Sequence, residues 1–213
     1  MSKSSNVSKK PFLHKSVLEQ EGSKSSMDED RELVKQTLQG DKKAFEMILN
    51  KHQQPLLNYI GRMVGNRELA LDFTQEVFIK TYSSLSTYQP QFKFRTWLFK
   101  IASNYIIDFW RKKKIDAFSI DQSGKGDVDR PSFEIPSNEP SICARFELAE
   151  LRVKIEKSLD KLPPHLRELF IWRHINEFSY EEIAEIKGLP VGTVKNRVFQ
   201  AKEFIRQLLE KQK

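Results

Sequence analysis

The stretch SYEEIAEIKGLPVGTVKNRVFQAKEFI, residues 179–205, decides the fold of the C-terminal part of the chain. Ser179 and Glu182 have the spacing of a capping box, which marks the start of a short helix. Gly188 permits the positive φ of a tight turn, and a second helix follows from about Pro190. The apolar residues of that second helix, spaced to face inward together, are Val194, Val198, Ala201 and Ile205. This order of elements predicts a helix-turn-helix.

The outward residues near the start of the second helix suit contacts with DNA. In a helix-turn-helix these positions meet base edges in the major groove. Arg and Lys pair with guanine, Asn and Gln pair with adenine, and Thr can contact phosphate. The candidate contacts are Thr193, Lys195, Asn196, Arg197 and Gln200. The alternative is an ordinary helical hairpin with a solvated polar face.

Upstream of this motif, residues 28–115 also have helical periodicity. Four helices are expected, over about 28–39, from Asp41 through Ile60, over 67–85 and over 93–114. The expected inward residues are Phe45, Ile48, Leu49, Leu56 and Ile60 in the second helix, and Leu69, Phe73, Val77 and Tyr82 in the third. Alternation of period two is absent from the sequence. The predicted fold class is therefore all-α, with two small helical domains joined by a flexible linker.

Basic and aromatic residues alternate in the last of these four helices. Residues 93–114 carry seven basic side chains and one acid, Asp108. Rings interleaved with cations suit unpaired nucleic acid, because bases stack on rings while cations follow phosphates. The alternative is that Phe94, Trp97 and Ile101 are core residues and the charges form a solvated face.

Composition limits the classes of protein to be considered. The chain has 213 residues, a net charge of +7 and a pI near 9.3, so a polyanionic partner is expected. No apolar run approaches the roughly 20 residues of a membrane span, and the first residues lack the apolar run of a secretory signal. A single cysteine, Cys143, fits a reducing compartment. We therefore expect a cytoplasmic protein without membrane insertion.

Charge and proline content divide the chain further. Residues 1–27, rich in Ser and Lys, predict a disordered basic extension. Residues 116–141 include six acids, two bases and three prolines, so we expect an acidic flexible linker before a C-terminal domain at 142–213. One hypothesis is that this linker screens the basic helices from DNA in the free protein. The alternative is that its acids only keep it extended.

The sequence does not favour an enzyme. The four histidines are scattered, and the nucleotide-binding loop, the hydrolase nucleophile motif and the HExxH motif are all absent. We expect no catalytic residues, no metal site and no cofactor.

Taken together, the motifs resemble a bacterial RNA polymerase sigma factor of the extracytoplasmic-function type, in the sigma-70 family. In the first half the matching residues are Asp72 to Phe78, Phe94, Trp97, Leu98, Ile101, Ala102, Asn104, Asp108 and Arg111. In the second half they are Leu162, Pro163, Arg167, Phe170, Tyr180, Glu182 to Ala184, Gly188 and Gly192 to Arg197. Lys187 departs from the pattern, which usually has an apolar residue there, so its stem should snorkel or the packing should be looser.

The resemblance implies a sigma region 2 helical bundle at 28–115 and a sigma region 4 helix-turn-helix at 142–213. Region 2 would bind the β′ clamp of core polymerase through Asp72, Phe73, Gln75, Glu76 and Phe78. It would contact the minus-ten promoter element through Ser86, Tyr88, Gln89, Lys93, Arg95, Asn104, Arg111, Lys112 and Lys113. The helix-turn-helix would contact the minus-thirty-five element through the five residues named above.

The resemblance also implies promoter DNA and the polymerase β flap as partners, and it allows for an anti-sigma factor. The alternative function is a stand-alone, dimeric helix-turn-helix regulator. The two differ in one simple respect, because a regulator binds its duplex alone whereas a sigma factor of this type needs core polymerase.

Overall fold

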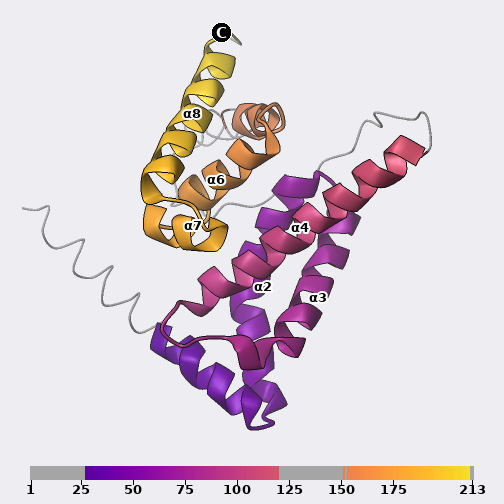
Figure 1. Cartoon of the computed structure of the whole chain (residues 1–213), viewed down its shortest axis with the longest axis vertical. Coiled ribbons are helices and arrows are strands. Elements are labelled where there is room, and N and C mark those ends of the chain that lie inside the picture. Colours follow the sequence, from indigo (N-terminus) through magenta and orange to yellow (C-terminus); the bar gives the residue numbers. More distant parts are fainter. Residues whose placement is uncertain (1–26, 120–150, 152, 212–213) are drawn as a thin grey trace, which may run out of the picture. The chain divides into compact units, whose positions relative to one another are not determined.

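The computed structural model describes residues 27–119, 151 and 153–211, and of residues 113–119 the backbone only. Every regular element in these ranges is helical, which confirms the predicted all-α class (Figure 1). The elements with full bounds are α2 (Lys42–Val64), α3 (Arg67–Ser83), η1 (Leu85–Thr87), α4 (Phe94–Ser119), α6 (Pro164–His174), α7 (Tyr180–Lys187) and α8 (Val191–Glu210). Residues 1–26 of the predicted extension and residues 120–141 of the predicted linker lie outside the described ranges. Met27 is helical and α4 continues to Ser119, so the predictions that the extension includes residue 27 and that the linker begins at residue 116 were wrong. None of the described helices is both long and apolar enough to cross a bilayer.

The chain divides into two compact units, residues 1–48 and 49–213. In the described part of the first unit, residues 27–38 form a helix that buries Leu33 and Val34. Gly40 follows this helix with a φ of +100°, the left-handed conformation predicted for the residue after its end. Asp41 Oδ1 then accepts a hydrogen bond of 2.9 Å from the Lys43 backbone, as expected at the start of α2.

In the second unit, α3 and α4 pack along one another (Figure 1). The inward stripe of α3 runs through Ala70, Phe73, Val77 and Thr81, spaced three, four and four residues apart, and Thr74 and Phe78 are buried beside it. Tyr82 is 49% exposed, so the prediction that it faces inward was wrong. One residue beyond Thr81 is rotated by about 100° around the helix, and the buried Leu85 closes that end of the core instead.

The C-terminal helices of the same unit follow the sequence closely. Pro164 begins α6, where a proline costs no hydrogen bond. Both hydrogen bonds of the predicted capping box are present, between Ser179 and Glu182, and Gly188 ends α7 with a φ of +63°. The predicted inward residues of α8 are all buried, at 5% exposure or less: Val194, Val198, Ala201 and Ile205. They form the buried face of α8, which packs on α6 and α7.

The turn at Gly188 gives a stability prediction. A side chain there meets no atom within 4 Å, so Gly188→Ala adds only the backbone strain of a positive φ. We expect a loss of about 1–2 kcal/mol in the free energy of unfolding, measured by urea titration of the full chain. Gly192→Ala is the matched control, since it also meets open space but lies in α8. That variant should gain up to about 1 kcal/mol, and equal effects at both positions would contradict the argument.

Candidate polymerase and nucleic-acid interfaces

The start of α8 presents a polar surface whose geometry is set by the turn before it. Lys195, Asn196 and Gln200 are exposed, and Thr193 and Arg197 are partly exposed. They lie opposite the buried stripe of α8, so the structure brings all five predicted residues to one end of one helix. Their role in binding DNA stays a prediction.

An aromatic ring lies next to this surface, and its contacts with two cations were not predicted from the sequence. The Tyr180 ring has two cations near it, with Arg173 Cζ 4.7 Å and Lys195 Nζ 5.6 Å from its centroid. Arg173 is itself held in place by a hydrogen bond of 3.0 Å from its guanidinium to the Phe178 carbonyl. This arrangement extends the basic surface from α8 back to α6. Nothing local in the sequence links the three residues, because Arg173 precedes the motif.

The loop between α3 and α4 is fixed by its own side chains. Tyr88 is buried; its hydroxyl donates a 2.6 Å hydrogen bond to the Phe92 carbonyl, and its ring packs against Phe94 and Trp97. Ser86 and Gln89 are exposed on the same loop. Of the three predicted minus-ten residues in this loop, Tyr88 therefore holds the backbone while Ser86 and Gln89 face outward.

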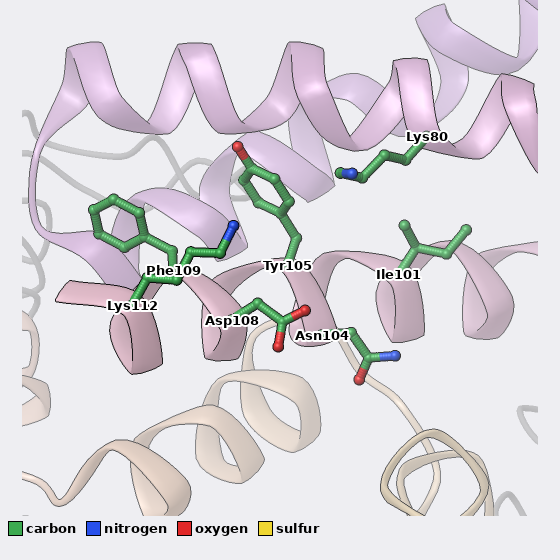
Figure 2. A pocket seen from close by; sticks show the side chains of 7 residues that line it. All are labelled: Lys80, Ile101, Asn104, Tyr105, Asp108, Phe109 and Lys112. Carbon is green, nitrogen blue, oxygen red and sulfur yellow. The ribbon is translucent and has the colours of Figure 1, made fainter. Parts of the chain in front are cut away.

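A cavity of about 320 Å³ lies between α3 and α4 (Figure 2). It is lined by two predicted minus-ten residues, Asn104 and Lys112, and by Lys80, Ile101, Tyr105, Asp108 and Phe109, which were not predicted to bind DNA. Figure 2 shows the Tyr105 ring extending from α4 toward α3, and Lys80 Nζ lies 5.6 Å from the centre of that ring. Partial burial and the negative charges of Glu76 and Asp72 raise the pKa of Tyr105, so its hydroxyl stays protonated at neutral pH.

The basic residues near the end of α4 differ in whether they form ion pairs within the helix. Arg111 forms an ion pair of 2.9 Å with Asp108, one helical turn earlier. Both side chains are largely exposed, so the pair contributes little stability and leaves Arg111 accessible. The side chain of Lys113 lies outside the described residues.

The two predicted minus-ten residues at the start of α4 are engaged within the protein. Lys93 Nζ lies 3.1 Å from Glu182 Oε1 in α7. Arg95 Cζ lies 4.1 Å from the centre of the Phe178 ring, and Arg95 Nε is buried with no hydrogen-bond acceptor among the described residues. Both cations therefore face the helix-turn-helix in this structure.

The predicted polymerase-binding residues on α3 divide into two groups. Asp72, Gln75 and Glu76 are exposed on one side of the helix. Phe73 and Phe78 are buried, and Phe73 makes edge-to-face contacts with Tyr105 and Phe109 at 4.9 and 4.8 Å. The phenylalanines thus support the face from behind. Ile79, 59% exposed and one turn after Gln75, is an apolar member of this face that the sequence reading missed.

Comparison with known proteins identifies the family. Residues 48–115 match the family model for Sigma-70 region 2, and residues 152–205 match the model for Sigma-70, region 4. The ECF RNA polymerase sigma factor SigW of Bacillus subtilis is 34% identical over 83% of this chain and 94% of its own length. The RNA polymerase sigma-H factor of Pseudomonas aeruginosa is 30% identical over 87% of this chain and 96% of its own.

Solved structures agree with this assignment. The structure of CnrH in complex with the cytosolic domain of CnrY has a TM-score of 0.62 at 26% identity, covering 87% of this chain and 99% of that one. The sigma factor RpoE of Bartonella quintana, in complex with the anti-sigma factor NepR, has the same TM-score at 24% identity and supports the fold, covering 79% of this chain and 98% of its own. The chain belongs to the extracytoplasmic-function sigma factors of the sigma-70 family, a family of transcription initiation factors.

The division of the α3 residues gives a second prediction. Phe73→Ala removes a ring packed between two others in the core and should cost about 3–5 kcal/mol in the free energy of unfolding. Glu76→Ala changes an exposed side chain and should stay within about 0.5 kcal/mol of the wild type. Urea titrations of the two variants measure this difference. Comparable losses would show that Glu76 belongs to the packing of α3.

Proposed function

We propose that this protein binds the core of bacterial RNA polymerase and directs it to specific promoters. The observation that carries the proposal is the presence, in one chain, of an exposed acidic and amide face on α3 and a helix-turn-helix with an exposed basic and amide face on α8. An acidic face suits a protein partner of complementary charge, and the basic and amide face suits duplex DNA. Both belong to segments that match sigma factor family models.

Within this proposal, α3 binds the β′ clamp of the polymerase through Asp72, Gln75 and Glu76, with Phe73 and Phe78 as their packed support. The C-terminal helices would contact the β flap. Unpaired bases of the minus-ten element would bind at the loop after α3 and along the first part of α4. The proposed contacts are the exposed Ser86 and Gln89, the cavity at Asn104 and the cations of α4. The start of α8 would contact the minus-thirty-five element in the major groove.

An anti-sigma factor is proposed as a further partner. A protein with a similar fold, the sigma factor RpoE of Bartonella quintana, is described in complex with the anti-sigma factor NepR, and CnrH is described in complex with the cytosolic domain of CnrY. The exposed apolar residues Ile79 and Tyr82 on α3 and Phe199 and Phe204 on α8 offer surface for such a partner. The stand-alone regulator is not favoured, because this chain aligns with nearly the whole length of relatives that are named sigma factors.

The polymerase contact is tested by reversing one charge. Glu76→Lys should weaken binding to core polymerase at least about tenfold, because an exposed side chain at an interface is replaced by one of opposite charge. Its thermal stability should remain that of the wild type. Fluorescence anisotropy of labelled factor titrated with core polymerase measures the affinity, and Glu46→Lys, exposed on α2, is the control for charge alone. Unchanged affinity in Glu76→Lys would remove α3 from the interface.

The promoter contact is tested at two positions on α8. Arg197→Ala should cost about 1–3 kcal/mol and relax preference at one base pair, if its guanidinium pairs with a base edge. Lys195→Ala, directed at phosphate, should weaken all sequences alike and reduce the salt dependence of binding. Holoenzyme transcription from a library of randomised promoters measures both preferences. Identical preference profiles for the wild type and both variants would show that neither residue recognises sequence.

A further inference from the structure

One carboxylate lines the cavity between α3 and α4, on a segment whose other charges are basic. Asp108 is the single acid among residues 93–114, which carry seven basic side chains. It lines the cavity together with Asn104, one helical turn before it, and with the ring of Tyr105 (Figure 2). The cavity therefore combines a negative group, an amide and an aromatic ring.

The ion pair of Asp108 with Arg111 does not account for the presence of this acid. Arg111 Nη2 lies 2.9 Å from Asp108 Oδ1, and the two side chains are 68% and 55% exposed. An exposed pair of this kind contributes little stability. A carboxylate also repels the phosphates that the neighbouring cations attract. Asp108 thus weakens DNA binding in general unless it accepts a hydrogen bond from the DNA itself.

The ion pair leaves one oxygen of the carboxylate for a ligand. Arg111 contacts Oδ1, so Oδ2 is the oxygen that remains to accept a hydrogen bond. An ionised carboxylate only accepts, whereas the amide of Asn104, exposed four residues earlier, both donates and accepts. Side chains four residues apart are neighbours on a helix, and Figure 2 shows the two groups beside one another along α4.

These groups match the Watson–Crick edge of two of the four bases. Unpaired cytosine presents an exocyclic amine beside the acceptor N3, and unpaired adenine presents one beside the acceptor N1. The amine would donate to Asp108 Oδ2, and the Asn104 amide would donate to the ring nitrogen. Thymine has a carbonyl oxygen in place of the amine, so the carboxylate repels it. Guanine has two adjacent donors that need both oxygens of a carboxylate, and Arg111 engages one of them.

The other residues of the lining suit the remaining parts of a nucleotide. Ile101, Tyr105 and Phe109 give the cavity apolar walls, which favour entry of an unstacked base. Lys80 of α3 and Lys112 of α4 reach the lining from two helices, where they suit the phosphates on either side of such a base. The volume of about 320 Å³ lies at the lower end of the range for ligand pockets, which suits a single base.

We propose that Asp108 is a specificity-determining residue of the minus-ten contact. It admits to the cavity an unpaired base that carries an exocyclic amine, cytosine or adenine, and disfavours thymine and guanine. Arg111 orients the carboxylate through the ion pair. The inference rests on the function proposed above and extends it, because that function leaves open which base the cavity takes.

A promoter library with a randomised minus-ten element tests the proposal, with holoenzyme assembled from core polymerase and the full chain. At one position of the element the wild type should favour cytosine or adenine over thymine at least about tenfold, the discrimination of one charged hydrogen bond. Asp108→Ala removes the acceptor and should reduce that ratio to within about twofold. Asp108→Asn adds a donor in the same shape and should raise the share of thymine further. Sequencing of the transcribed promoters measures the ratios.

Base analogues test the hydrogen bond directly. At the position where Asp108→Ala loses its preference, purine replaces adenine, or 2-pyrimidinone replaces cytosine, so that only the exocyclic amine is missing. The analogue should lower the affinity of wild-type holoenzyme about tenfold and that of Asp108→Ala holoenzyme by no more than about twofold. Competition between the two promoters for holoenzyme measures both losses. Their non-additivity would identify the amine as the partner of Asp108.

Glu203→Gln is the matched control. Glu203 on α8 pairs with Arg206, three residues later, at 2.8 Å, so this variant also removes one carboxylate and one surface ion pair of the same spacing. Because Glu203 does not line the cavity, the minus-ten preference should stay that of the wild type. Thermal melting should be nearly unchanged in all the variants, since neither ion pair is buried.

The outcomes separate this proposal from the proposed function. Identical minus-ten preferences in the wild type and Asp108→Ala would overturn the role of Asp108, and so would equal losses of affinity on the analogue. A wild-type preference for thymine or guanine at the position that Asp108→Ala affects would overturn the choice of base. A wild-type chain that neither binds core polymerase nor initiates at any member of the library would instead overturn the proposed function, and the specificity proposal with it.

Discussion

The carboxylate of Glu168 is almost inaccessible to water, and a charge in that position is tolerated only where donors replace the lost hydration. Those donors come from three helices separated widely in the chain: Tyr59 on α2, Ser103 on α4 and Lys187 on α7. The positions of α2, α4, α6 and α7 thus depend on one anion. Removal of any one partner would leave a buried polar group without a hydrogen bond, so the Glu168 carboxylate constrains how these helices pack.

The sequence was sufficient for the parts of the fold that depend on neighbours in the chain. The capping box at Ser179, the left-handed Gly188 and the buried stripe of α8 all arise from spacings of three or four residues. Such local patterns are visible without the structure because helical geometry is periodic. The candidate residues at the start of α8 were found for the same reason, as the polar positions opposite that stripe.

Contacts between distant segments could not be predicted in this way. Lys187 was expected to snorkel or to loosen the packing, but its partners Glu168 and Ser103 lie 19 and 84 residues away. The sequence also did not show which residues of the motifs are exposed. Phe73, Phe78 and Tyr88 were predicted to contact a partner, and they are buried. In our proposal these three side chains therefore act indirectly, by holding the exposed residues next to them in place. The hypothesis that the acidic linker screens the basic helices concerns residues outside the described ranges.

Glu182 makes two contacts through its two carboxylate oxygens. Its Oε2 accepts the 2.7 Å hydrogen bond from the Ser179 backbone that completes the capping box, while its Oε1 pairs with Lys93. The cap and the ion pair use different oxygens, so loss of the Lys93 contact does not remove the cap on α7. The turn at Gly188 and the buried face of α8 likewise depend on residues of the C-terminal helices. The exposed surface at the start of α8 is therefore positioned by contacts within the C-terminal helices themselves.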